Sequence, residues 1–198
     1  MKLSFDVSRT AVLCMDYQAG IVSIYAKDDE SVLQRAHSVL KRARSFGMTV
    51  IHVRVSFRAG CPEISTRNML LSAIKASVKH QQLFEGVTGA IHSAVAPEGN
   101  EVIVTKSRVN AFAGTDLELI LRAGGTETLI LFGIATSGVV LSTLLEAADR
   151  DYRIVVIGDC CVDLDQDAHT FLTEKVFPRQ ATVISTSDFL DSTVEGSR

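Results

Sequence analysis

The chain lacks the segments that would carry it into or across a membrane. Its first residues, MKLSFDVSRT, contain no apolar stretch of the kind found in signal peptides. No apolar run approaches the roughly 20 residues that a helix needs to cross a bilayer. From these absences we expect a cytoplasmic protein that does not associate with a membrane.

Concentrated charge and nucleotide-binding motifs are also missing. The net charge is −3, and the basic side chains are scattered along the chain, so no nucleic-acid partner is expected. There is no G-x-G-x-x-G after the first predicted strand and no P-loop lysine. A hydrophobic content of 46% over 198 residues is enough for a sizeable core. We therefore expect a single domain over residues 1–198 that acts on a small molecule.

The few cysteines show no metal-binding or disulfide pattern. They have no C-x-x-C spacing and form no Cys/His cluster that would indicate zinc. In a cytosolic protein they are expected to be free thiols. The four residues are Cys14, Cys61, Cys160 and Cys161.

What the chain does have is a regular alternation of apolar runs with segments of helical period. The apolar runs predict six strands, at residues 10–16, 48–55, 101–106, 129–132, 154–157 and 181–185. Helices are predicted at residues 30–46, 69–78, 116–123 and 167–177, and between the fourth and fifth strands. Residues 17–29 and 56–68 are expected to be loops, and the tail from Val194 is expected to fray. This order predicts an α/β three-layer sandwich with a parallel sheet.

Three of the predicted strands end in chemically informative residues. Asp16 follows the first strand, Lys106 ends the third, and the turn 133–138 follows the fourth. Parallel strands bring their carboxyl ends to one edge of the sheet, where ligands bind in open α/β folds. The turn also opens a helix, whose N-terminal N–H groups favour developing negative charge. We therefore expect these three features to form one site.

The chain resembles the isochorismatase-like hydrolase superfamily, often called cysteine hydrolases, in three blocks of sequence. They read TAVLCMDYQ, TKSRVNAFAGTDLELILR and LILFGIATSGVVLSTLLEAADRDYRIVVIGD, and the resemblance extends over about residues 10–188. It implies a Rossmann-like sheet of strand order 3-2-1-4-5-6 and a homo-oligomer, dimeric or larger. The Asp-x-His pair that nicotinamidases carry after the second strand is missing here, so we expect no catalytic metal and no cofactor.

The resemblance also assigns candidate site residues. It implies that Asp16 and Lys106 are catalytic and that a cis peptide lies within residues 134–136, which we place at Ala135-Thr136. The turn expected to bind the reacting oxygen contains Ala135, Thr136, Gly138 and Val139. The candidate substrate-binding residues are Gln18, Arg58 and Phe112, where Arg58 would meet an anionic group and Phe112 an apolar ring.

The nucleophile position departs from the family pattern. The turn of the family commonly reads G-x-A-T-x-x-C-V-x-x-T, which places Val139 at the cysteine, and valine cannot form a thioester. Isochorismatases of the superfamily also lack this cysteine and cleave a vinyl ether with the aspartate as proton donor. We therefore predict a hydrolase that uses general acid-base chemistry of Asp16 and Lys106. Two alternatives stay open: a catalytically inactive protein that binds a metabolite or a protein partner, and an amidase with an unusual nucleophile.

Overall fold

Six parallel strands form the central sheet of the computed structural model, which describes residues 3–27 and 29–194. Their spatial order is β4-β3-β2-β5-β6-β7, which confirms the predicted order 3-2-1-4-5-6. The strands are β2 (Thr10–Met15), β3 (Thr49–Val55), β4 (Val102–Lys106), β5 (Thr128–Gly133), β6 (Arg153–Ile157) and β7 (Thr182–Ile184).

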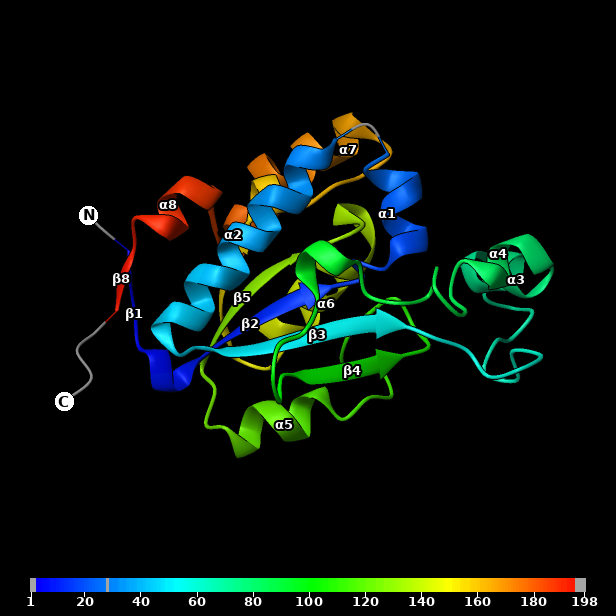
Figure 1. Cartoon of the computed structure of the whole chain (residues 1–198), viewed down its shortest axis with the longest axis horizontal. Helices are drawn as coiled ribbons and strands as arrows, with labels where there is room; N and C mark the ends of the chain where they lie inside the picture. Colours follow the sequence, from blue (N-terminus) through cyan, green and yellow to red (C-terminus); the bar gives the residue numbers. More distant parts are fainter. Residues whose placement is uncertain (1–2, 28, 195–198) are drawn as a thin grey trace.

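Helices cover the sheet, and Figure 1 shows α2 and α5 on opposite sides of it. No helix in the described part of the chain is long and apolar enough to cross a membrane. The helices are α1 (Ala19–Tyr25), α2 (Glu30–Phe46), α3 (Met69–Lys75), α4 (Val78–Gln82), α5 (Leu117–Ala123), α6 (Leu141–Asp149), α7 (Gln166–Phe171) and α8 (Thr186–Leu190).

The central strands are apolar on both faces because both faces are covered. Every residue of β2 is buried, and so are Leu129 to Gly133 of the adjacent β5. His52, in the middle of β3, is buried as well, and its Nε2 lies 3.0 Å from Oε2 of Glu101. This hydrogen bond satisfies Nε2, which would otherwise be costly to bury, whereas Nδ1 of the same ring is buried without a partner among the described residues.

Helix α2 shows how local sequence sets its ends. The Asp29 side chain accepts a hydrogen bond from the Ser31 N–H and caps the first turn. Gly47, with φ of 76°, ends the helix in the left-handed conformation that glycine adopts without strain. The predicted bounds of this helix are confirmed.

Two predicted segments were wrong in detail. The expected loop 17–29 contains α1. The helix expected at 69–78 ends at Lys75, and Ser77 caps α4 by accepting from the His80 N–H. A serine side chain competes with the backbone for such N–H groups, so it favours a new helix start over continuation.

The C-terminal predictions also need correction. The helix predicted at 167–177 is α7 followed by a π-helical turn, Leu172–Val176. Val194 does not fray, because β8 (Thr193–Val194) pairs in parallel with β1 (Ser4–Phe5). The rest of that tail, 195–198, lies outside the described residues.

Between β3 and β4 the chain leaves the sheet and returns. This excursion, residues 56–88, which we call the arm, carries α3 and α4 beyond the carboxyl ends of the strands (Figure 1). It has a small apolar cluster of its own, formed by Cys61, Ile64 and Leu71 with Phe57 and Ile74 packed against them. The arm is therefore partly independent of the main core.

Gly133 ends β5 where the backbone of β2 comes closest. A Cβ at this position would lie 2.7 Å from the Met15 carbonyl oxygen and 2.9 Å from its Cβ. Gly133→Ala should therefore lower the free energy of unfolding by about 1–3 kcal/mol, the usual cost of overpacking. Gly138→Ala is the matched control, because a Cβ there meets nothing within 3.8 Å. Urea unfolding of both variants tests this, and equal losses would contradict it.

Candidate active site

Asp16 and Lys106 meet at the carboxyl edge of the sheet. Asp16 follows the last residue of β2 in a left-handed conformation, φ 59°, and its N–H donates to the Val53 carbonyl over 2.8 Å. Lys106 ends β4, on the far side of β3. Its Nζ lies 2.7 Å from Asp16 Oδ2 and also donates to the Arg108 carbonyl over 3.0 Å. The two strand ends are thus joined by a buried ion pair, with exposed fractions of 5% and 2%.

Burial dominates the electrostatics of the aspartate. It raises the pKa of the Asp16 carboxyl above its usual value, although the charge and hydrogen bond of Lys106 pull that pKa down. Oδ1 of Asp16 is buried and accepts no hydrogen bond from any described residue. A carboxyl group with a raised pKa and one unengaged oxygen is suited to give a proton to a bound molecule and to take it back.

The pair lines a cavity of about 170 Å³ whose walls are mostly apolar. Helix α1 contributes Ile21 and Tyr25, and the arm contributes Leu70, Leu71, Ile74 and Phe84. Val55, Val109 and the exposed Arg108 complete one side. The turn after β5 contributes Ile134, Ala135, Gly138 and Val139. A small molecule in this cavity would meet hydrocarbon nearly everywhere except at Asp16, Lys106 and Arg108.

The turn after β5 differs from expectation in two respects. The cis peptide is Ile134-Ala135, one residue earlier than the predicted Ala135-Thr136. The N–H groups of Thr136 and Gly138, expected to bind a reacting oxygen, donate instead to the carbonyls of Val162 and Ala135. A π-helical turn, Thr136–Val140, then leads into α6.

Two polar residues that the sequence did not single out, Asp163 and His169, form hydrogen bonds to this turn. The Asp163 carboxylate accepts a hydrogen bond of 2.7 Å from the Ser137 N–H. The Thr136 hydroxyl, which is fully buried outside the cavity, lies 2.8 Å from Nδ1 of His169. Sequence spacing gives no signal for these contacts, because the partners are 26 and 33 positions apart.

Gln18 does not reach the cavity, which contradicts its expected contact with substrate. Its side chain is 0% exposed. Its amide nitrogen donates to the carbonyls of Val55 and Gly89, and its amide oxygen accepts from the Val55 N–H. The hydrogen-bonding groups of this side chain are thus occupied by backbone.

Arg58 and Phe112 also lie away from the acid pair. The Arg58 side chain is 79% exposed, pairs with Glu63 over 2.7 Å and lines a separate cavity of about 670 Å³. Arg108 lines both cavities. Phe112 is buried and stacks on Tyr152, with ring centroids 6.2 Å apart. Neither residue is therefore placed to touch a molecule held at Asp16.

No cysteine lines the cavity, and all four thiols are buried. Burial raises the pKa of Cys14 and Cys160 well above the ordinary value and that of Cys161 to about 12. Such thiols remain protonated near neutral pH and are poor nucleophiles. Across residues 3–27 and 29–194, no three His, Cys, Asp or Glu side chains are grouped to hold a metal ion. The absence of a catalytic metal stays a prediction.

The comparisons with known proteins agree with the fold. The isochorismatase domain family matches residues 10–188, so the chain belongs to the isochorismatase family. A maleamate amidohydrolase of Pseudomonas putida is 27% identical over 81% of the chain and 76% of its own length. The isochorismatase family protein YwoC of Bacillus subtilis is 30% identical over 96% of both chains. The predicted membership of a hydrolase family is confirmed.

Solved structures show the same architecture. An isochorismatase family protein from Burkholderia thailandensis is 27% identical and superposes with a TM-score of 0.79 over 95% of this chain and 96% of its own. The agreement over nearly the whole of both chains confirms the six-stranded parallel α/β fold.

The acid pair generates a prediction about proton binding. Lys106→Met removes the charge that lowers the pKa of Asp16, so that pKa should rise further. A carboxyl with a raised pKa makes the folded state hold a proton that the unfolded chain releases near 3.8. Stability therefore falls as pH rises through the interval between the two pKa values, and the variant extends this fall to higher pH.

A carbon-13 NMR titration of the side-chain carboxyl groups measures this directly. The control is Asp6, whose pKa is lowered chiefly by a hydrogen bond from the Ser8 side chain and should not change in the variant. An unchanged or lower pKa at Asp16 would contradict the assignment of Lys106 as its charge partner.

Proposed function

We propose that the chain is a hydrolase of a small metabolite in which Asp16 and Lys106 perform general acid-base chemistry without a covalent enzyme intermediate. The observation that carries this proposal is the Asp16 carboxyl. Lys106 holds Oδ2 at 2.7 Å, burial raises the pKa of the group, and Oδ1 has no hydrogen-bond partner among the described residues.

The steps follow from these contacts. The Asp16 carboxylate of the ion pair first takes up a proton, which its raised pKa favours. It then gives this proton to the bound substrate and becomes a carboxylate again, which Lys106 stabilises through its charge. Water adds to the activated substrate, and the proton it loses returns to Asp16. The bond of the leaving group then breaks, and Asp16 is again in the protonated state from which it gave its proton. Proton transfer of this kind contributes roughly 10²- to 10⁴-fold to a rate.

Val139 supports water as the nucleophile. It lines the cavity at the position where the family pattern has its cysteine, and its side chain offers no lone pair to attack a substrate. The buried native thiols have no access to the same space. The N–H groups of Ala135 and Val139 are the members of the turn that we assign to the reacting oxygen.

The cavity narrows the range of substrates. At about 170 Å³ it is smaller than the roughly 300–1,000 Å³ of common ligand sites, which favours a compact substrate. Arg108, at its exposed side, is placed to meet an anionic group. The name of the Pseudomonas putida relative indicates an amide, maleamate, so small amides and small vinyl ethers are the two classes to assay first.

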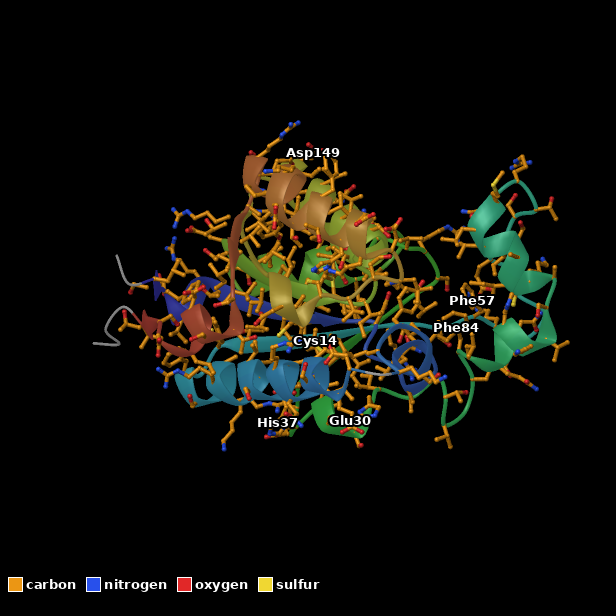
Figure 2. All side chains as sticks on the ribbon, turned by 90° about the horizontal axis from the view of Figure 1, so that it is seen from above. Cys14, Glu30, His37, Phe57, Phe84 and Asp149 are labelled. Atoms are coloured by element: carbon orange, nitrogen blue, oxygen red, sulfur yellow. The ribbon has the colours of Figure 1, made fainter. Side chains whose placement is uncertain are left out.

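Asp16→Asn tests the acid. The asparagine keeps the size of the side chain but carries no transferable proton, so hydrolysis of any substrate found should fall by roughly 10²- to 10⁴-fold. Asp149→Asn is the matched control, an exposed aspartate at the end of α6 that does not line the cavity and lies apart from the lining residue Phe84 in Figure 2. A full rate in Asp16→Asn would refute the proposed chemistry. Binding of several compounds with no turnover would favour a non-catalytic binding protein.

Thiol labelling separates acid chemistry from thiol chemistry. Iodoacetamide should leave hydrolysis nearly unchanged, because the native thiols are buried and the pKa values of Cys14, Cys160 and Cys161 are raised. Val139→Cys should be alkylated faster than any native cysteine, since it places a thiol near Lys106 at the start of a helix. Peptide mass spectrometry measures both rates. Loss of activity in proportion to labelling of one native cysteine would instead identify an amidase with an unusual nucleophile.

A further inference from the structure

The Gln18 side chain takes the place of a missing backbone hydrogen-bond partner in the sheet. The β2–β3 ladder runs in register to Met15 opposite Val53, and the left-handed turn at Asp16 then carries the backbone away. Val55 would be left without its next backbone partner. The Gln18 side-chain amide takes that place, accepting from the Val55 N–H over 2.6 Å and donating to the Val55 carbonyl over 3.0 Å. A side chain thus continues the hydrogen-bond pattern of a strand.

The same side chain reaches the other end of the arm. Its amide nitrogen also donates to the Gly89 carbonyl over 2.9 Å. Val55 and Gly89 are the residues that flank the arm on either side, so one buried amide ties its departure to its return. Backbone bonds from Ala19 to Ala90 and from Gly20 to Thr88 lie beside this tie.

The arm depends on its base for its position over the cavity. It packs around its own apolar cluster, and Figure 2 shows Phe57 and Phe84 together where it joins the rest of the molecule. Their rings meet edge to face with centroids 5.5 Å apart. From this base the arm presents Leu70, Leu71, Ile74 and Phe84 to the cavity that holds Asp16.

We propose that Gln18 is a positioning residue that holds the arm as the apolar wall of the reaction cavity. The wall selects substrates that place a short apolar group opposite Asp16 and excludes bulkier molecules. This inference rests on the proposed function only in treating the cavity as the place of reaction. Gln18 itself touches no substrate.

Gln18→Leu tests the tie with little change in volume. It leaves three buried backbone groups of Val55 and Gly89 without their partner, which costs enough to favour opening of the arm. A thiol introduced by Val139→Cys in the same chain reports access to the cavity. Two reagents of different size, iodoacetamide and fluorescein maleimide, are compared on it.

We expect the rate of the bulky reagent relative to the small one to rise about tenfold in Gln18→Leu, since unpaired buried groups shift an opening equilibrium by at least that factor. Labelling of Cys14 in the core of β2 should not change. Gln34→Leu, at an exposed glutamine of α2, is the matched control and should alter neither rate.

Gly20→Ala gives an independent test if Gln18→Leu does not fold. A Cβ at Gly20 would lie 2.6 Å from the Leu83 carbonyl oxygen in the arm, so it should displace the arm and raise the same ratio of rates. An unchanged ratio in the folded variant overturns the proposal. So does an equal rise for both reagents together with labelling of Cys14, because that pattern marks general destabilisation. Neither labelling measurement needs turnover, so the proposal about Gln18 can be refuted while the chemistry assigned to Asp16 stands.

Discussion

The buried ion pair between Asp16 and Lys106 constrains the rest of the site. It joins the ends of β2 and β4 across β3, so it forms only when all three strands are in register. Burying two charges is costly unless they are paired, and here the pair still leaves Asp16 Oδ1 without a hydrogen-bond partner in residues 3–27 and 29–194. Buried charges that carry such a cost occur most often at functional sites. The pair therefore depends for its stability on the apolar sheet beneath it.

The surroundings of the pair are built by segments of very different character. The turn after β5 is fixed from behind by Asp163 and by the contact between Thr136 and His169. Another part of the cavity wall comes from the arm, which has its own small apolar cluster. Because the arm packs separately from the sheet and from the turn after β5, the shape of the cavity can vary while Asp16 and Lys106 keep their positions.

The strand ends were predictable because the pattern of apolar runs places Asp16 and Lys106 at one edge of any parallel sheet. The roles of Gln18 and Phe112 were not predictable, because a residue type does not reveal which distant backbone group or ring its side chain will contact. Gln18 was expected to touch substrate, yet it bonds Val55 and Gly89. The apolar wall could not be predicted, because the pattern at 69–78 predicts one helix where the structure has α3 and the start of α4, and nothing in it indicates which side chains face the cavity. Contacts such as that of Thr136 with His169 arise only from tertiary packing.

The position of Asp16 and Lys106 along the chain also determines when the site can form during folding. They are separated by 90 positions, and β2 must pair with β5 as well as with β3 before the cavity is closed. Contacts between such distant segments are slow to form, because closing the intervening chain costs entropy before any contact repays it. No short fragment of this chain contains both halves of the pair. A nascent or partly folded molecule therefore lacks the contact between Asp16 and Lys106, and the appearance of this contact during refolding would report completion of the sheet.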